Sequence, residues 1–402
     1  MHLQSLLLSC FIGAATSSPF SHESFLDRRN ETSANCVGVN AISPDCASNE
    51  AGHYRDFFYV GGRYVNTSSG HLMYDQMYVE KLTPIAGVTK ANPVVFFHAI
   101  AGTTWLNTPD NRKGFASYFI DQGYQVYVIE QTSVGHGAEN DFTNFPLIAG
   151  GAAENSEKGY TAPERLNAYP QSQNHTQWPG NGTLGDPIFD AFQSTFLPRT
   201  SNQTAQELSM RRAGCALLRL LARPSFLVTH SIGALYGTLL SNDCPGLVAG
   251  NVALEPGNIP FQNYYGNATD PVGRTAARPY GLATTPLGYE PPVASADELA
   301  TQTVGVDARA RRSCVMQVEP ARRLPNVAKV PYVAVMGEAS PHATYDHCTV
   351  GYLRQVGVVD AELMALADKV IRGNGHFLHM ELNNLEIAAA VEEWMRGKAE
   401  KV

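Results

Sequence analysis

Ser231 has the surroundings of a catalytic nucleophile. It lies in Thr-His-Ser-Ile-Gly (229–233), after an apolar run and before small residues with helical spacing. A strand-to-helix turn of this kind exposes the serine hydroxyl and leaves the N–H of Ile232 free to donate to an oxyanion, while Gly233 lets the helix approach the strand. The usual motif begins with Gly where this chain has Thr229, so the pattern also fits a serine in an ordinary turn.

His376 is the candidate general base. It follows Gly-Asn-Gly between the last predicted strand and the last predicted helix, and such a loop lets an imidazole reach the nucleophile. Three carboxylates are candidates to orient this imidazole and stabilise its cation. Glu255 follows the strand after that of the nucleophile, whereas Glu338 and Asp346 follow the next strand along the chain. Each of the three also fits a carboxylate in a solvated turn.

The oxyanion site requires a second N–H donor, and the loop after the predicted strand 93–99 is its natural source. There the N–H of Ile100 or of Ala101 could act together with that of Ile232. We expect no metal and no cofactor, because the chain contains no H-E-x-x-H, no Walker loop and no G-x-G-x-x-G after a strand. Three side chains of one segment have metal-binding groups, but a structural loop is the better interpretation: His342, Asp346 and His347.

Apolar runs and helical patterns that alternate along the chain must position these residues. The runs are short and continuous, as in strands buried on both faces of a parallel sheet. We therefore expect an α/β fold with about eight mostly parallel strands and helices on both faces. Two local expectations are an opening hairpin built from 55–65 and 73–82, and a helix followed by a short strand over 361–376.

The chain divides into three parts. Residues 1–18 contain a short apolar core followed by small residues and are typical of a signal peptide, with a disordered leader as the alternative. Residues 19–50 form a polar N-terminal segment, and residues 51–402 form one domain. Because long irregular stretches rarely serve as simple connections, we expect the insertions at about 140–204 and 256–326 to form a cap.

Cysteines and sequons predict a secreted glycoprotein. Cys10 lies in the leader, and the other six cysteines form an even set that would pair in an oxidising compartment. Fifteen pairings are possible, and free buried thiols are the alternative. We favour the pairs Cys36–Cys46, Cys215–Cys244 and Cys314–Cys348. The six N-x-S/T sequons predict glycans on Asn30, Asn66, Asn174, Asn181, Asn202 and Asn267.

The composition excludes several other classes of protein. Of the 402 residues, 44% are apolar, which is enough to form a large buried core. Only 16% are charged, which is too few for a disordered chain. The formal net charge is −8 and the basic residues are scattered, so we expect no nucleic-acid partner. No apolar run in the chain, the leader included, reaches the roughly 18 residues that a membrane span requires.

Eight segments carry a resemblance to a known group of proteins, and together they cover most of the chain from about residue 55 onward. They are FFYVGGRYV, WLNTPDNRKGFASYFIDQGYQVYVIEQ, TAPERLNAYPQSQNHTQWPG, THSIGALYG, ALEPGNIPF, TTPLGYEPPV, GEASPHATYDHCTVGYLRQVG and GNGHFLHMELNNLEIAA. In these segments the chain resembles the secreted, fungal-type α/β-hydrolase esterases whose catalytic acid is a Glu directly after the strand that follows the nucleophile. The resemblance implies an α/β-hydrolase fold and a serine carboxylic ester hydrolase.

The resemblance also implies roles for single residues. Ser231 would be the nucleophile, Glu255 the acid and His376 the base, and Thr229 becomes an ordinary residue at its position. The chain departs from the group at three places. His98-Ala99-Ile100 replaces the usual His-Gly-Gly, residues 133–137 replace a Gly-Arg-Gly type of sequence, and Ile232 replaces a common Gln.

We therefore expect a secreted, glycosylated serine hydrolase that cleaves small-molecule carboxylic esters or lactones through an acyl-enzyme. The changed oxyanion loop motivates an alternative, a tailoring enzyme of small-molecule biosynthesis that uses the same triad for acyl transfer, cyclisation or C–C cleavage. A third hypothesis is a non-catalytic binding protein that has kept the fold. Four aromatic residues are candidates to line the substrate pockets, with burial in the core as the alternative: Trp105, Trp178, Tyr264 and Tyr265.

Overall fold

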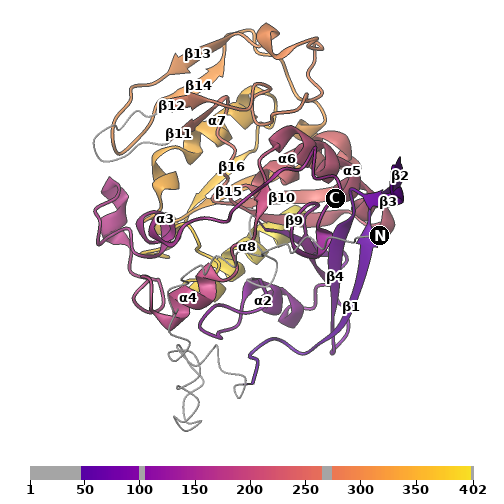
Figure 1. Ribbon diagram of the computed structural model, residues 1–402. Helices are drawn as coiled ribbons and strands as arrows, with labels where there is room; N and C mark the ends of the chain where they lie inside the picture. The colour runs from indigo at the N-terminus through magenta and orange to yellow at the C-terminus, as the bar shows by residue number, and fades with distance from the viewer. Residues whose placement is uncertain (1–46, 99–104, 265–273, 400–402) are drawn as a thin grey trace, which may run out of the picture. The chain divides into compact units, whose positions relative to one another are not determined.

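A central eight-stranded sheet organises the protein (Figure 1). The computed structural model describes residues 47–98, 105–264 and 274–399. The strand order is β1-β4-β6-β5-β9-β10-β15-β16; the two pairings β1–β4 and β4–β6 are antiparallel and all the others are parallel. The bounds are β1 His53–Val60, β4 Met77–Pro84, β5 Val94–Phe97, β6 Val126–Glu130, β9 Ser225–His230, β10 Val248–Leu254, β15 Tyr332–Met336 and β16 Glu362–Ala365. This arrangement confirms the predicted α/β fold.

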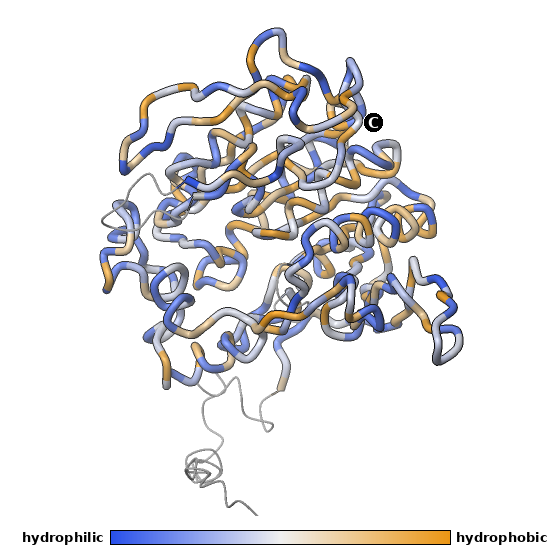
Figure 2. Tube along the Cα trace, turned by 45° about the horizontal axis from the view of Figure 1, so that its top comes forward, coloured by the Kyte–Doolittle hydropathy of each residue, from blue (hydrophilic) through white to orange (hydrophobic). Residues whose placement is uncertain are grey.

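Helices cover both faces of the sheet because the central strands are apolar on both faces. In β5, for example, Val95 and Phe97 belong to one core cluster, whereas Val94 and Phe96 belong to the other, as the period of two along a strand requires. The first cluster includes side chains of α5 (Gln203–Leu221), α6 (Gly233–Asp243) and α7 (Asp346–Gln355). The second includes side chains of α2 (Phe115–Asp121) and α8 (Asn384–Ala399). Figure 2 shows hydrophobic residues along the central strands and many hydrophilic residues in the outer loops.

The two long insertions contain short elements of their own. In 140–204 these are β7 (Leu147–Ile148), α3 (Ala153–Ser156), a π-helix (Glu157–Thr161), a 3₁₀-helix (Pro170–Asn174), α4 (Pro187–Gln193) and β8 (Arg199–Thr200). In 256–326 they are a 3₁₀-helix (Ala296–Glu298) and four strands that pair as two small antiparallel sheets, β11 (Gln262–Tyr264) with β12 (Arg274–Ala276) and β13 (Thr301–Val304) with β14 (Cys314–Gln317). Trp178, Phe192 and Phe377 share a separate apolar cluster, so the first insertion packs against the loop that contains His376.

The structure corrects two local expectations. The opening segments form β1 and β4, which pair as antiparallel neighbours. A second hairpin, β2 (Arg63–Thr67) with β3 (Gly70–Tyr74), lies between these two strands in the sequence. The helix expected at the start of 361–376 is wrong, because these residues form edge strand β16 and a 3₁₀ turn, Leu366–Lys369. Pairing with β15 satisfies the backbone groups of β16, and this tertiary gain outweighs a weak local preference for helix.

Within the described ranges, two of the predicted disulfides join neighbouring elements. Cys215–Cys244 connects α5 to the end of α6, and Cys314–Cys348 connects β14 to α7. Of the predicted glycan sites, Asn66, Asn174 and Asn181 are exposed and Asn202 is half-buried. Several predictions concern residues outside the described ranges: the signal peptide 1–18, most of the segment 19–50, Asn30, Asn267, Cys36 and Cys46. In the part of the chain that the structure describes, no helix has the length and apolar character of a membrane span.

Candidate active site

Ser231 lies in a sharp turn between β9 and α6. Its φ is +53°, a left-handed conformation that non-glycine residues rarely adopt. Three backbone hydrogen bonds hold this turn: the Ser231 N–H donates to Leu254 O at 3.0 Å, and Ser231 O accepts the N–H of Gly257 at 2.9 Å and that of Ala234 at 3.1 Å. A Cβ on Gly233 would lie 2.8 Å from the carbonyl oxygen of Phe97, so glycine is required for α6 to begin this close to β5.

Thr229 fits the first position of the turn without strain on the site. Its side chain is fully buried, and its hydroxyl donates to Val252 O of the neighbouring strand β10 at 3.1 Å. The threonine therefore gains a cross-strand hydrogen bond where the usual motif has a glycine.

His376 bridges Ser231 and Glu255. Its Nε2 lies 3.1 Å from Ser231 Oγ, and its Nδ1 lies 3.4 Å from Glu255 Oε2. Burial, and next the neighbouring His230, lower the pKa of His376 well below its ordinary value of 6.5. A neutral imidazole with Nδ1–H directed to the carboxylate has its Nε2 lone pair free to accept the serine proton, so this geometry can perform general-base catalysis.

Glu255 occupies a second sharp turn, directly after β10, with φ +51°. The carboxylate is fully buried and accepts hydrogen bonds from the Gly337 N–H at 2.6 Å and from the Ser340 hydroxyl. Burial raises the pKa of Glu255 to about 8, although the charge of His342 and these two donors oppose the rise. An imidazolium at His376 would add a further force in favour of the carboxylate.

The other two candidate acids bind elsewhere. Glu338 pairs with Arg372 at 2.8 Å and accepts the Gly373 N–H at 3.2 Å. Asp346, fully buried, bonds to His342 Nδ1 at 2.9 Å. Among the described residues, Glu255 is thus the carboxylate that contacts the ring of His376.

Two aromatic rings stack on the His376 ring, and neither was singled out for this role by the sequence. The ring of His342 stacks on that of His376 with centroids 4.8 Å apart and an interplanar angle of 14°. The ring of Tyr160 also stacks on that of His376, with centroids 4.9 Å apart and an angle of 29°. His342 Nδ1 also lies 3.8 Å from Glu255 Oε2. His347 does not join this group, because its Nε2 bonds to Arg312 O at 3.1 Å. The His-x-x-x-Asp spacing of residues 342–346 is the sequence signal that could have indicated the pair of His342 with Asp346.

The oxyanion candidates are only partly described. Ile232 directly precedes α6, where helix N–H groups are unpaired, and the described residues offer its N–H no acceptor. Ile100 and Ala101 lie outside the described residues. His98, the last described residue before them, is buried and directly follows β5.

Among the described residues, three sets of side chains place possible metal-ligand atoms within 4.8 Å of one another, and the third of them, Cys314, His347 and Cys348, includes the two sulfurs of a disulfide. The first, Glu255, His342 and His376, coincides with the candidate acid and base. The second, His98, His230 and His379, lies among aromatic rings and includes the residue that directly precedes Ser231, and burial lowers the pKa of all three imidazoles. His230 Nε2 donates to the carbonyl oxygen of His376 at 2.9 Å, so this second set contacts the loop of the candidate base.

The two tryptophans proposed to line the substrate pockets belong to the core. Trp105 is fully buried and packs against Phe96 and His379, and Trp178 packs against Phe192. The side chain of Tyr264 and all of Tyr265 lie outside the described part of the chain.

Comparison with known proteins supports the same interpretation of the fold. No family model matches the chain. The chain is 39% identical over 343 residues to the probable secreted lipase phiG of a fungal species (strain ATCC 74256), a match that covers 85% of this chain and 89% of the lipase. The solved structure of a novel bacterial esterase superposes with a TM-score of 0.53 at 19% identity and covers 88% of this chain and 99% of that one.

Proposed function

Because the chain belongs to the α/β-hydrolase family of secreted ester hydrolases, we propose that it cleaves carboxylic esters with Ser231 as nucleophile, His376 as general base and Glu255 as the acid that orients the base. The observation that supports this assignment most strongly is the continuous contact from Ser231 Oγ through the His376 ring to Glu255 Oε2. Three separate loops, after β9, after β10 and after β16, contribute one residue each. We include in the proposal export by the signal peptide 1–18, glycosylation and a lactone or ester of a small molecule as substrate.

Acylation begins when His376 Nε2 takes the proton of Ser231 and the serine oxygen attacks the ester carbonyl carbon. The carbonyl π electrons move to its oxygen, which becomes the oxyanion. When this tetrahedral intermediate collapses, the bond to the alcohol oxygen breaks and His376 gives its proton to that oxygen. The products of this half-reaction are the free alcohol and an acyl ester on Ser231.

Deacylation repeats the steps with water. His376 Nε2 takes a proton from water as the water oxygen attacks the acyl carbon, and Ser231 leaves with the proton that His376 returns. In both halves the ionised form of Glu255 stabilises the imidazolium, whose positive charge favours the carboxylate against the effect of burial, and the donors Gly337 and Ser340 hold this carboxylate in place.

The oxyanion is stabilised by the N–H of Ile232 and by a second N–H from Ile100 or Ala101. The replacement of Gly by Ala99 and Ile100 keeps every backbone N–H, so the donors that the chemistry needs are still in the chain. Loss of one such donor costs roughly 10²–10³ in turnover, so the conformation of this loop strongly affects the rate.

A fluorophosphonate probe tests the assignment. We expect it to label the wild type on Ser231 and to leave Ser231→Ala unlabelled, with hydrolysis of p-nitrophenyl acetate lost in parallel. A folded wild type that is not labelled would favour the non-catalytic binding protein.

Two matched carboxamide variants separate the candidate acids. Glu255→Gln should lose ester hydrolysis, whereas Glu338→Gln, which only breaks the contact with Arg372, should retain it. The reverse result, in proteins that remain folded, contradicts the triad.

A further inference from the structure

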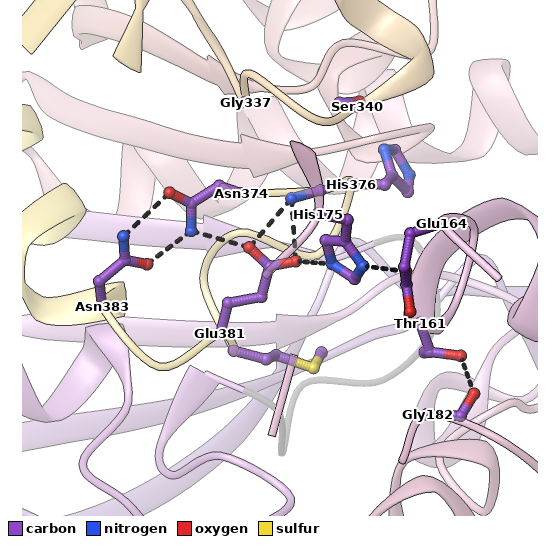
Figure 3. A network of polar contacts seen from close by, with 12 residues as sticks. Thr161, Glu164, His175, Gly182, Gly337, Ser340, Asn374, His376, Glu381 and Asn383 are labelled. Atoms are coloured by element: carbon purple, nitrogen blue, oxygen red, sulfur yellow. Dashed lines mark hydrogen bonds and ion pairs between the residues drawn. The ribbon is translucent and has the colours of Figure 1, made fainter. Parts of the chain in front are cut away.

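The loop that carries His376 is held by a fully buried carboxylate, Glu381 (Figure 3). Its two oxygens accept the N–H of Gly375 at 2.9 and 3.0 Å, and one of them accepts the side-chain amide of Asn374 at 2.8 Å. Asn374 in turn exchanges hydrogen bonds with Asn383. Because Gly375 directly precedes His376, the position of the base depends on this carboxylate.

His175, from the first insertion, supplies the charge opposite Glu381. Its Nε2 lies 2.9 Å from Glu381 Oε1 and its Nδ1 lies 2.9 Å from Glu164 Oε2, and only 1% of its side chain is exposed. A ring that bonds to a carboxylate at each nitrogen donates from both, which requires the imidazolium form. We name Glu164, His175 and Glu381 the His175 bridge.

The His175 bridge is packed tightly against the loop of the base. A Cβ on Gly375 would lie 3.0 Å from His175 Nε2 and 3.1 Å from Glu381 Oε1, so only glycine lets the imidazole come this close. The Thr176 N–H also donates to Gly373 O at 3.1 Å. Since Tyr160 of the same insertion stacks on the His376 ring, the insertion touches both the base and the loop beneath it.

We propose that His175 is a positioning residue, whose imidazolium fixes the loop 373–376 through Glu381 and so makes turnover depend on the first insertion. The proposal rests on His376 as the general base. It assigns to the insertion 140–204 a role in orienting the catalytic machinery in addition to covering it.

The ionisation of His175 gives this role a pH dependence. Burial lowers the pKa of His175, but the hydrogen bonds and charges of Glu381 and Glu164 outweigh burial and raise it above 6.5. The bridge is therefore complete below pH 6.5 and is lost as the pH rises through the raised pKa. The titratable and charged groups around the bridge are Glu164, Glu381, Tyr169 and Arg165, with Glu255 within electrostatic range of Tyr169.

The first experiment measures kcat and KM for p-nitrophenyl acetate from pH 5 to 9 in the wild type, His175→Gln and His136→Gln. His136 provides the matched control, because it also bonds to a glutamate at 2.9 Å but is exposed. We expect His175→Gln to lower kcat roughly 10- to 100-fold at pH 6 with KM nearly unchanged, as for a small misplacement of a catalytic group. The control should match the wild type, and a wild-type kcat in His175→Gln would overturn the proposal.

The second experiment uses Glu164→Gln, which changes the half-buried outer partner of His175 and leaves the loop contacts intact. Loss of one carboxylate lowers the pKa of His175, so turnover should decline at a lower pH than in the wild type while kcat at pH 5 to 6 stays the same. A residue that only stabilised the fold would not change the pH at which turnover declines. An unchanged profile, in a variant whose melting temperature is also unchanged, would contradict the positioning role.

A double-mutant cycle completes the test. Residues that act as one unit show strongly non-additive effects, so His175→Gln combined with Glu381→Gln should lower kcat no more than Glu381→Gln does by itself. Fully additive losses would overturn the proposal. Should Ser231→Ala retain hydrolysis, the proposed triad would fail, and this outcome is distinct from every result above.

Discussion

Substitution of Gly233 by Ala probes the joint between the nucleophile turn and the sheet. The added methyl group would lie 2.8 Å from the backbone oxygen of Phe97, whereas ordinary contacts of a Cβ begin at 3.4 Å. The obstacle is a carbonyl of the buried strand β5, which cannot turn aside as a flexible side chain would. The start of α6 must therefore move by about 0.6 Å relative to the strand.

This displacement has two expected costs. Overpacking of this kind lowers the free energy of unfolding by about 1–3 kcal/mol, and each kcal/mol lowers the melting temperature by roughly 1–2 °C in a domain of this length. The displacement also shifts Ser231 and the Ile232 N–H from the path of attack, for which we expect a loss of roughly 10- to 100-fold in kcat.

The assay compares Gly233→Ala with Gly397→Ala by thermal unfolding and by hydrolysis of p-nitrophenyl acetate. A Cβ on Gly397, in α8, meets no atom within 4 Å, and Ala there favours the helix, so this control should keep full activity and the same or a higher melting temperature. Wild-type kcat in Gly233→Ala would refute the argument that this glycine positions the nucleophile.

Three further predictions concern stability. Burial raises the pKa of Glu255 from 4.5 to about 8. Between these two pH values the native state keeps a proton that the unfolded chain has lost, so the free energy of unfolding measured in urea should fall as the pH rises from 5 to 8. The variant Glu255→Gln should show a smaller change of this free energy with pH. Replacement of Cys215 and Cys244 by Ser should lower that free energy by about 3–4 kcal/mol, because the disulfide closes a loop over a separation of 29 residues, and an unchanged thermal midpoint would contradict this. Asn202 caps α5 by accepting the Ala205 N–H at 3.1 Å, so Asn202→Ala should cost about 1 kcal/mol, whereas Asn202→Asp, which also removes the sequon, should retain the cap.

The strands and the candidate nucleophile were predictable because their signals are local. Continuous apolar runs of β5, β9 and β10 are what a strand buried on both faces requires, and all residues of these three strands are buried. The turn of Ser231 has its small residue, Gly233, within two positions along the chain. Strand β16 was mistaken for helix since its short apolar pattern is ambiguous and its pairing partner is distant in sequence.

The choice among the carboxylates depended on tertiary structure. Glu255 and Glu338 both follow parallel strands, so the residues themselves left both open, and only the resemblance favoured Glu255. In the fold, the backbone turn at Glu255 directs its carboxylate to His376, whereas Arg372 draws Glu338 away. The register of the strands and the geometry of the turns after them decide which side chain reaches the imidazole, and a local sequence pattern predicts neither of them.

The sequence by itself determined the kind of fold and the segments that carry Ser231, Glu255 and His376, because burial period and turn chemistry act over a few residues. Only the tertiary structure brought His342, Tyr160 and the His175 bridge to the base. His175 and Glu381 are 206 residues apart in the chain, and their contact depends on how the first insertion packs. Ionic contacts of this range are set by the three-dimensional arrangement of loops, and no spacing along the chain encodes them.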